Sequence, residues 1–313
     1  MSARHYDVIV LGAGSAGLTA GIYLGRAKLK TLIINEGTVG GQMVLTHAVA
    51  NYPGVLETGG FQLSQIMKQQ ARQFGCKIES NVEVTQLDLI SKVKQVEIDH
   101  DEVYTADAVI IATGGKPRKL GLLSEDQFKG LGISYCATCD GDFYAGKDII
   151  VVGGGNSALE EAVSLTKWVN SVTIIHQFDH FQAHQHAIDE ATNHPKISFI
   201  MESEITKFLG NDTVEGVSII NKRTGETSVV PTNGVFIYIG YLPNSEKFKG
   251  IVDLSEYGEV IVDENMKSNL PGVFAAGDIR KKKYRQITTA VSDGTIAALS
   301  TIDYIQNLKN NFV

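Results

Sequence analysis

The 313-residue sequence has little cysteine, no long hydrophobic run and no excess of positive charge. Its three cysteines include one Cys-x-x-Cys pair, with no second pair to complete a four-ligand zinc site. No apolar run approaches the roughly 20 residues that cross a membrane. A net charge of −7 argues against nucleic acid as a general partner. What remains is the composition of a globular enzyme of about two domains.

The amino-terminal residues run directly into a buried-strand pattern at residues 6–11, which leaves no room for a secretion leader with its cleavage site. We therefore expect a cytoplasmic protein, in a compartment where thiols are kept reduced. There, a Cys-x-x-Cys pair is expected to serve catalysis or metal binding and not to staple the fold. The separate Cys76 is predicted to be structural.

Two stretches of the chain repeat one pattern of strand, glycine-rich turn, helix and strand. In the first, an apolar run at 6–11 precedes Gly12-Ala13-Gly14-Ser15-Ala16-Gly17, a helix-like segment and a second strand at 31–35. In the second, the strand at 147–152 precedes Gly153-Gly154-Gly155-Asn156-Ser157-Ala158, a helix from Leu159 and a strand at 171–175. The repeat predicts two dinucleotide-type domains in tandem.

Two further strands end in glycine and proline, at 108–117 and at 234–243, where we expect the chain to cross between domains. The sequence thus predicts an α/β protein with two Rossmann-like, three-layer ββα domains, the second inserted into the first. The discontinuous domain takes residues 1–117 and 243–313, with a helix beginning near Thr288. The inserted domain takes residues 118–242.

The first glycine loop is predicted to bind the pyrophosphate of a dinucleotide. It follows a strand and opens a helix, so its amides can hold phosphate at the positive end of the helix dipole. Glu36 follows the second strand, where a carboxylate can bind ribose hydroxyls. Strand, turn, helix and acid agree, which favours a ligand over a tight turn alone.

The segment Cys136-Ala137-Thr138-Cys139-Asp140 lies between the two glycine loops and carries the chemistry. Thiols at this spacing can close into a disulfide, and the adjacent carboxyl can handle the proton that thiol–disulfide exchange releases or consumes. The order of motifs indicates flavin chemistry connected to a dithiol.

The second glycine loop lacks the cations that NADPH needs. No Arg or Lys occurs between Lys167 and Lys196, and His176-Gln177-Phe178-Asp179-His180-Phe181-Gln182 follows the strand. Loss of two charged hydrogen bonds would cost about 3–6 kcal/mol, on the order of 10²–10⁴ in affinity. NADH would need an acid directly after the strand, and Asp179 comes late for that role. The alternative is that the second glycine loop is retained only as a packing turn and binds no nucleotide.

Five histidines cluster at residues 176–194, and His180 and His184 could share a helix face and bind a metal. A solvated helix with some pH sensitivity is the favoured interpretation, and no metal site is predicted.

Arg280-Lys281-Lys282-Lys283-Tyr284-Arg285 gathers five basic residues within an acidic chain. Such a stretch can steer an acidic protein partner. A solvated turn with one residue on a cofactor is the competing interpretation.

These motifs together resemble the low-molecular-weight thioredoxin reductases over essentially the whole chain. The resemblance implies a homodimer that reduces thioredoxin, with Cys139 facing a flavin, Cys136 exchanging with thioredoxin and Asp140 acting as acid and base. It implies FAD as cofactor, with contacts from Gly12, Gly14, Ser15, Ala16, Gly17, Asn35, Glu36, Gly41, Gln42, Asn51, Val84, Ala112, Thr113, Gly114, Gly277, Asp278, Arg285, Gln286 and Ile287.

The chain departs from that family at its His-Arg-Arg-x-x-x-Arg signature, where Gln177, Phe178 and Gln182 replace the three arginines. In this it resembles the ferredoxin-dependent flavin thioredoxin reductases of clostridia. We therefore expect electrons from reduced ferredoxin, with residues 280–285 as a candidate docking edge. The alternatives are a thioredoxin reductase that binds NADH or NADPH in a non-standard way, and a flavin-bound redox sensor.

Overall fold

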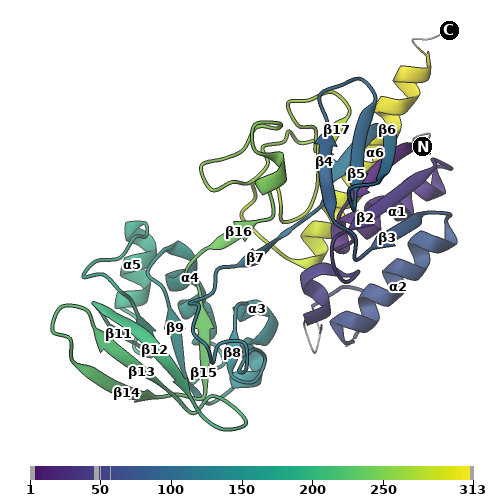
Figure 1. Ribbon diagram of the computed structural model, residues 1–313. Helices are drawn as coiled ribbons and strands as arrows, with labels where there is room; N and C mark the ends of the chain where they lie inside the picture. Colours follow the sequence, from purple (N-terminus) through teal and green to yellow (C-terminus); the bar gives the residue numbers. More distant parts are fainter. Residues whose placement is uncertain (1–3, 46–48, 50, 57, 311–313) are drawn as a thin grey trace. The chain divides into compact units, whose positions relative to one another are not determined.

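The computed structural model describes residues 4–45, 49, 51–56 and 58–310 (Figure 1). Residues 1–3, the start of the amino-terminal segment discussed above, lie outside these ranges. The chain divides into two compact units, residues 1–116 with 242–313 and residues 117–241. The two crossings between them, β7 (Gly115–Pro117) and β16 (Tyr241–Pro243), pair as a two-stranded sheet.

The discontinuous unit is built on a parallel sheet with an antiparallel extension. Its strands are β1 (Arg4–Leu11), β2 (Thr31–Asn35), β3 (Lys77–Ser80), β4 (Val84–Asp88), β5 (Lys94–Ile98), β6 (Glu102–Ile111) and β17 (Val273–Ala275). They follow the order β3-β2-β1-β6-β5-β4. The first half of β6 pairs antiparallel with β5 and its last three residues pair in parallel with β17, so the sheet divides along β6.

Helices cover one face of the parallel strands, and the β4–β5 hairpin and the chain before β17 cover the other. The helical elements are α1 (Ser15–Arg26), η1 (Gly41–Leu45), α2 (Gly60–Gln73), η3 (Glu246–Phe248) and α6 (Ile287–Asn310). Alternate residues of β1 belong to different cores: Val8 and Val10 pack with the helices, and Ile9 and Leu11 with the hairpin side. A strand buried on both faces explains the continuous apolar run in the sequence.

The inserted unit repeats this plan on a smaller scale. Its parallel sheet has the order β11-β10-β9-β15-β8, with β8 (Ile133–Ser134), β9 (Asp148–Val152), β10 (Ser171–Ile175), β11 (Ile197–Ile200) and β15 (Gly234–Ile237). An antiparallel sheet of β12 (Ser203–Leu209), β13 (Gly216–Asn221) and β14 (Thr227–Pro231) lies over one face. The short helical segments α3 (Ala137–Asp140) and η2 (Gly141–Tyr144) and the helices α4 (Asn156–Leu165) and α5 (Gln185–Thr192) complete the unit.

The fold confirms the predicted class of two Rossmann-like units and corrects one local expectation. His180 and His184 do not share a helix face, because α5 begins at Gln185 with His184 as its N-cap. Among the described residues, no group of three or more His, Cys, Asp or Glu side chains is placed to hold a metal ion. Within the same ranges, no helix is both long and apolar enough to cross a membrane.

Candidate functional site

The first glycine loop joins β1 to α1 in the shape that a bound pyrophosphate requires. Gly12 has φ +109°, and a Cβ there would lie 2.2 Å from the carbonyl oxygen of Ala112, so only glycine fits. Gly14 is the N-cap of α1 and makes no side-chain capping bond. The first amides of α1 therefore face the loop at the positive end of the helix dipole.

Several separate segments with predicted cofactor contacts meet at this loop. Gly40 N donates to the carbonyl of Ala13 at 2.7 Å, which brings Gly41 and Gln42 beside the loop. Ala112 N donates to the carbonyl of Leu11 at 2.7 Å, and a Cβ on Gly277 would lie 2.8 Å from that of Ala16. Asn35 Oδ1 accepts from Ala13 N of the loop at 2.9 Å. Two other predicted contact residues bond to each other, because Asn51 Nδ2 donates to Gln286 Oε1 at 3.3 Å.

Glu36 follows β2 directly, at the place expected for a ribose-binding acid. Its Oε1 accepts a hydrogen bond from Val84 N at 2.9 Å and also pairs with Lys247 Nζ. Lys247 in turn donates to the carbonyl of Val84 at 2.6 Å. These contacts fix one carboxylate oxygen of Glu36. No sequence pattern indicates Lys247, because it lies in η3, far along the chain from Glu36.

Asp278 offers a buried acceptor for a ligand hydroxyl. Its Oδ1 is buried without a hydrogen-bond partner among the described residues, and Lys282 Nζ lies 3.6 Å away. Burial raises the pKa of Asp278, against the opposing charges of Lys282 and Arg285. A buried polar atom of this kind is normally hydrogen-bonded in the working protein.

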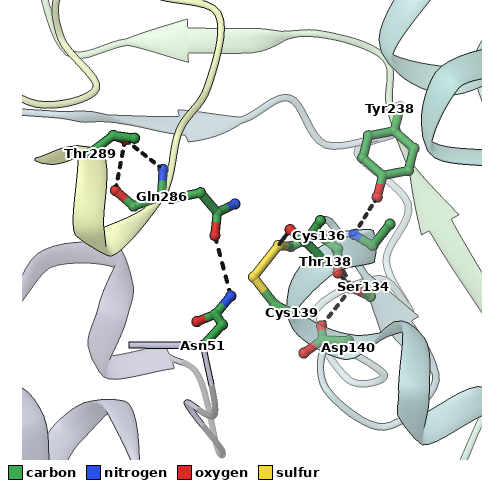
Figure 2. Close-up of a disulfide and its surroundings, with 10 residues drawn as sticks. Asn51, Ser134, Cys136, Thr138, Cys139, Asp140, Tyr238, Gln286 and Thr289 are labelled. Carbon is green, nitrogen blue, oxygen red and sulfur yellow. Dashed lines mark hydrogen bonds between the residues drawn. A yellow bond between two sulfur atoms is a disulfide. The ribbon is translucent and has the colours of Figure 1, made fainter. Parts of the chain in front are cut away.

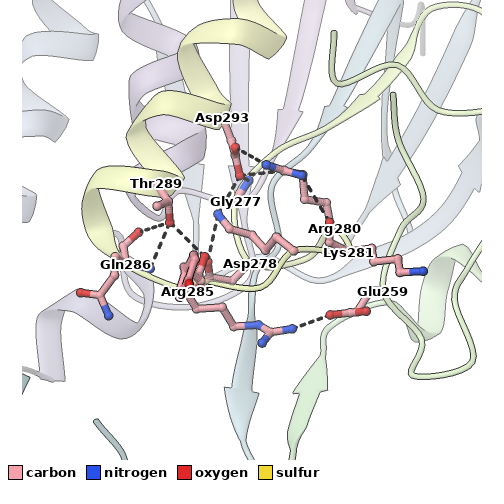
Figure 3. A network of polar contacts seen from close by, with 11 residues as sticks. Glu259, Gly277, Asp278, Arg280, Lys281, Arg285, Gln286, Thr289 and Asp293 are labelled. Carbon is pink, nitrogen blue, oxygen red and sulfur yellow. Dashed lines mark hydrogen bonds and ion pairs between the residues drawn. The ribbon is translucent and has the colours of Figure 1, made fainter. Parts of the chain in front are cut away.

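The loop after Asp278 is held by a buried ion cluster centred on Asp293 of α6 (Figure 3). Asp293 accepts from Arg280 Nε at 2.9 Å and Nη2 at 2.7 Å, from Lys282 Nζ at 2.7 Å and from Gly277 N at 3.2 Å. We call Asp293, Arg280, Lys282 and Gly277 the Asp293 cluster. It fixes the backbone that presents Asp278.

The basic stretch 280–285 is therefore largely occupied within the protein. Arg280 and Lys282 belong to the Asp293 cluster, and Arg285 pairs with Glu259. Lys281 and Lys283 remain exposed. Of the basic docking edge predicted at 280–285, only these two lysines keep exposed charges. The acids that pair with the other three cations lie on distant segments and could not be identified from the sequence.

The residues of this unit fit the FAD that the resemblance implies. The glycine loop suits a pyrophosphate and Glu36 a ribose. Asp278 Oδ1, which has no hydrogen-bond partner among the described residues, suits a hydroxyl of the cofactor chain. Ser15 and Ile287 lie in the first turns of α1 and α6, and Thr113-Gly114 follow β6.

Cys136 and Cys139 form a disulfide across the first turn of α3 (Figure 2). Cys136 is the N-cap of α3, and the two Cα atoms are 5.3 Å apart. Both cysteines are partly exposed, and Thr138 Oγ1 lies 3.5 Å from Cys136 Sγ. The pair can therefore exchange with an external dithiol.

Two residues that the sequence did not single out organise this turn. Ser134 Oγ donates to Asp140 Oδ2 at 2.6 Å and accepts from Cys136 N at 3.1 Å. Tyr238 Oη accepts from Ala137 N at 2.6 Å. Ser134 lies two residues before Cys136, so its closeness to the motif could have identified it from the sequence. Tyr238 lies 101 residues from Ala137 in sequence, so only the fold reveals it.

The remaining cysteine, Cys76, is isolated from this chemistry. Its side chain is buried, and Sγ donates to the carbonyl of Gly21 at 3.0 Å. Burial raises the pKa of its thiol to about 11, which keeps it protonated and unreactive at neutral pH.

The second glycine loop is packed against the segment 176–184. The imidazole of His176 is 3% exposed, and a Cβ on Gly154 would lie 2.4–2.5 Å from its ring atoms. Gln182 N donates to the carbonyl of Gly154 at 2.8 Å, and His184 N donates to Asn156 Oδ1 at 2.8 Å. The backbone at Gln182 and His184 is thus bonded to the loop, and none of residues 177–182 is Arg or Lys.

Comparisons with known proteins agree over nearly the whole chain. A family model described as pyridine nucleotide-disulphide oxidoreductase matches residues 6–294. The chain is 44% identical over 304 residues to a 34.2 kDa protein in the rubredoxin operon of Clostridium pasteurianum, covering 96% of this chain and 98% of that one. It is 44% identical over 308 residues to a thioredoxin reductase of Peptoclostridium acidaminophilum, covering 96% and 97%. The crystal structure of thioredoxin reductase from Streptococcus pyogenes has a TM-score of 0.91 at 39% identity, covering 98% of this chain and 100% of that one.

Proposed function

The chain belongs to the pyridine nucleotide-disulphide oxidoreductase family and, within it, to the low-molecular-weight thioredoxin reductases, and from this premise we propose that reduced ferredoxin and not NADPH supplies its electrons. The protein is a flavoprotein disulfide reductase with FAD as cofactor. FAD suits a ferredoxin donor, because a flavin can accept electrons singly and deliver them as a pair. The acceptor in this proposal is the disulfide of thioredoxin.

In the proposed cycle, Cys139 faces the flavin and Cys136 meets thioredoxin. The thiolate of Cys136 attacks one sulfur of the thioredoxin disulfide, so that one S–S bond breaks and a mixed disulfide forms. Cys139 then attacks the Cys136 sulfur, which restores the enzyme disulfide and releases thioredoxin as a dithiol. Two electrons and two protons pass to thioredoxin. Asp140 protonates the departing thioredoxin sulfur and regains a proton from the Cys139 thiol as that thiol becomes the attacking thiolate.

The observation that carries the choice of donor is the composition of the segment beside the second glycine loop. Gln182 is bonded to Gly154, and Gln177 and Gln182 are both exposed, so the sites where cations could grip a nucleotide phosphate hold amides. The acid in the segment, Asp179, bonds to His180, which lowers the pKa of Asp179 and keeps it ionised. A carboxylate at this place repels a phosphate.

The proposal further includes a cytoplasmic homodimer in which residues 1–117 and 243–313 bind FAD and residues 118–242 carry the dithiol. The resemblance to the family supports these parts. The candidates for ferredoxin docking are Lys281 and Lys283, which are exposed while the neighbouring cations pair with acids of the protein. They lie beside Tyr284, which is 64% exposed. Charge of this kind chiefly affects the association rate, so its contribution should weaken with salt.

Anaerobic stopped-flow mixing tests the donor directly. Reduced ferredoxin should bleach the flavin absorbance of the FAD-loaded protein rapidly. NADPH and NADH at micromolar concentrations should leave it oxidised on the same timescale. Rapid bleaching by a pyridine nucleotide, with none by ferredoxin, would instead identify the nucleotide-dependent alternative.

A matched variant tests whether the missing cations are the reason that NADPH leaves the flavin oxidised. Gln177→Arg combined with Gln182→Arg replaces two exposed amides by guanidinium groups beside the loop. Two charged hydrogen bonds should tighten NADPH binding by on the order of 10²–10⁴.

A flavin-bound redox sensor differs from both enzymes in a further respect, because its dithiol would change state without turning over thioredoxin.

A further inference from the structure

Ser134 is a buried hydroxyl at the base of the dithiol turn. It is the last residue of β8 and pairs with Phe236 of the neighbouring strand β15, so its backbone is anchored in the parallel sheet. Its side chain is 4% exposed and points into the turn formed by Cys136, Cys139 and Asp140 (Figure 2). A buried hydroxyl in a rigid strand can hold a catalytic group in place with little motion of its own.

The hydroxyl group connects the acid to the backbone of the exchange cysteine. Ser134 Oγ lies 2.6 Å from Asp140 Oδ2 and 3.4 Å from the carbonyl oxygen of Cys136, and it accepts from Cys136 N at 3.1 Å. A serine has one proton to donate. The carboxylate is the closer acceptor and carries charge, so it takes the proton while Asp140 is ionised.

The same geometry serves the protonated acid. Serine has two lone pairs, of which Cys136 N–H uses one. When Asp140 gains a proton, the other lone pair can accept from it, and the Ser134 hydroxyl can turn to the Cys136 carbonyl. Ser134 therefore remains bonded to Asp140 in both protonation states through rotation of one hydrogen.

We propose that Ser134 is a positioning residue of the exchange reaction, which holds Asp140 against the dithiol turn while the acid loses and regains its proton. This rests on the proposed function, in which Asp140 is the acid and base. In the step itself the Asp140 O–H bond breaks and an S–H bond forms on the departing thioredoxin sulfur. Ser134 then donates to the new carboxylate.

Other titratable groups near the turn can be told apart from Asp140. Burial, and then the charge of Asp140, raises the pKa of Tyr144 to about 12. Burial, followed by Glu161 and other charges, raises that of Tyr238 well above its ordinary value, so both tyrosines stay neutral. Glu161 on α4 is a further acid, and burial and then Glu160 raise its pKa. Both Cys136 and Cys139 are retained in Ser134→Ala and in Tyr238→Phe, so the thiols do not distinguish the two variants.

The test compares Ser134→Ala with a matched control, Tyr238→Phe. Each substitution removes the acceptor of one backbone N–H in the same turn, at Cys136 or at Ala137, but only Ser134→Ala also removes the bond to Asp140. The measurement is the pH dependence of single-turnover oxidation of pre-reduced, FAD-loaded enzyme by thioredoxin disulfide.

Loss of a donor to the carboxylate favours its protonated form. In Ser134→Ala, the pH above which the rate falls should therefore move up by about one unit, equivalent to about 1.4 kcal/mol. Ser134→Thr keeps the hydroxyl, so the pH above which the rate falls should return to the wild-type value. Tyr238→Phe should lower the rate without moving that pH. An equal fall at every pH in Ser134→Ala would show a purely structural role and overturn the proposal.

Two measurements separate this inference from its premise. Flavin reduction by the electron donor, followed with thioredoxin absent, reports folding and cofactor loading of each variant. Asp140→Asn should remove the pH-dependent fall altogether. If the fall persists in Asp140→Asn, then another group such as Glu161 titrates and the assignment of Asp140 fails. If it disappears there but does not move in Ser134→Ala, the inference about Ser134 alone fails.

Discussion

Replacing Asp293 by asparagine should destabilise the FAD-binding unit strongly, although Asp293 itself is not predicted to touch the cofactor. The Asp293 and Lys282 side chains are each 5% exposed, and that of Arg280 is 21% exposed. Asp293→Asn keeps the size of the side chain and removes its charge. Two cations then remain in a largely buried place without their common partner.

Removal of one partner from a buried ion pair typically costs about 3–5 kcal/mol. The lower end applies here, because Lys282 Nζ is already 3.6 Å from Asp278 Oδ1 and keeps that acid as a partner. An asparagine oxygen can also still accept from Gly277 N. For a domain of this size, 1 kcal/mol corresponds to about 2–4 °C in Tm. The expected loss is therefore about 3 kcal/mol, or about 6–12 °C.

Thermal unfolding with two probes measures this loss. Flavin release reports on the FAD-binding unit, and fluorescence of the single tryptophan, Trp168, reports on the inserted unit. Asp303→Asn, at an exposed position on the same helix, is the matched control and should change stability by less than about 0.5 kcal/mol. Release of flavin at the same temperature from Asp293→Asn and Asp303→Asn would show that the Asp293 cluster does not stabilise this unit.

The pH dependence of this difference follows from the pKa of Asp293. Burial raises that pKa, but hydrogen bonds from Arg280 and Lys282, and their charges, lower it by more, so the folded value lies below the ordinary one. A carboxyl with a depressed folded pKa stabilises the protein above its unfolded pKa, about 3.9, and loses this effect as pH falls through the folded value. The gap between wild type and Asp293→Asn should be full at neutral pH and shrink below about pH 4.

Three further outcomes test other parts of the structure. In the reduced native protein at pH 8, a thiol reagent should label two of the three cysteines, and Cys76 only after unfolding, because its pKa is about 11; labelling of all three in the native state would contradict its burial. Glu36→Gln should weaken FAD binding to the apoprotein about tenfold or more by calorimetry, since a ribose hydroxyl loses a charged acceptor; unchanged affinity would remove Glu36 from the site. Gly154→Ala should cost about 1–3 kcal/mol in denaturant unfolding through its clash with the His176 ring, and His176→Ala should relieve part of this cost; additive effects would show that the two do not touch.

The sequence predicted the parallel strands and the first nucleotide loop well, because both depend on local patterns. The strand at 31–35 has the predicted bounds, and β1 and β9 differ from the predicted strands by two residues or fewer at either end. Apolar runs of strand length and a glycine turn before a helix are set by neighbouring residues. Such features can be identified without knowledge of the tertiary fold.

The contacts that organise the sites were beyond the sequence, because they join distant segments. Lys247 reaches Glu36 across 211 residues of chain, and Tyr238 reaches Ala137 across 101. The basic stretch gave a misleading signal for a related reason. Asp293 and Glu259, which pair with its cations, lie on other segments, so their neutralising charges could not be counted from composition.

We propose that ferredoxin electrons reach thioredoxin through FAD and the Cys136–Cys139 pair. The most direct measurement is an anaerobic assay that counts oxidised ferredoxin and newly formed thioredoxin thiols together. We expect one thioredoxin disulfide to be reduced for each pair of ferredoxin electrons. No thiols should form with NADPH or NADH in place of ferredoxin, and none with Cys139→Ser. Thioredoxin thiols that form with NADPH and not with reduced ferredoxin would contradict this proposal.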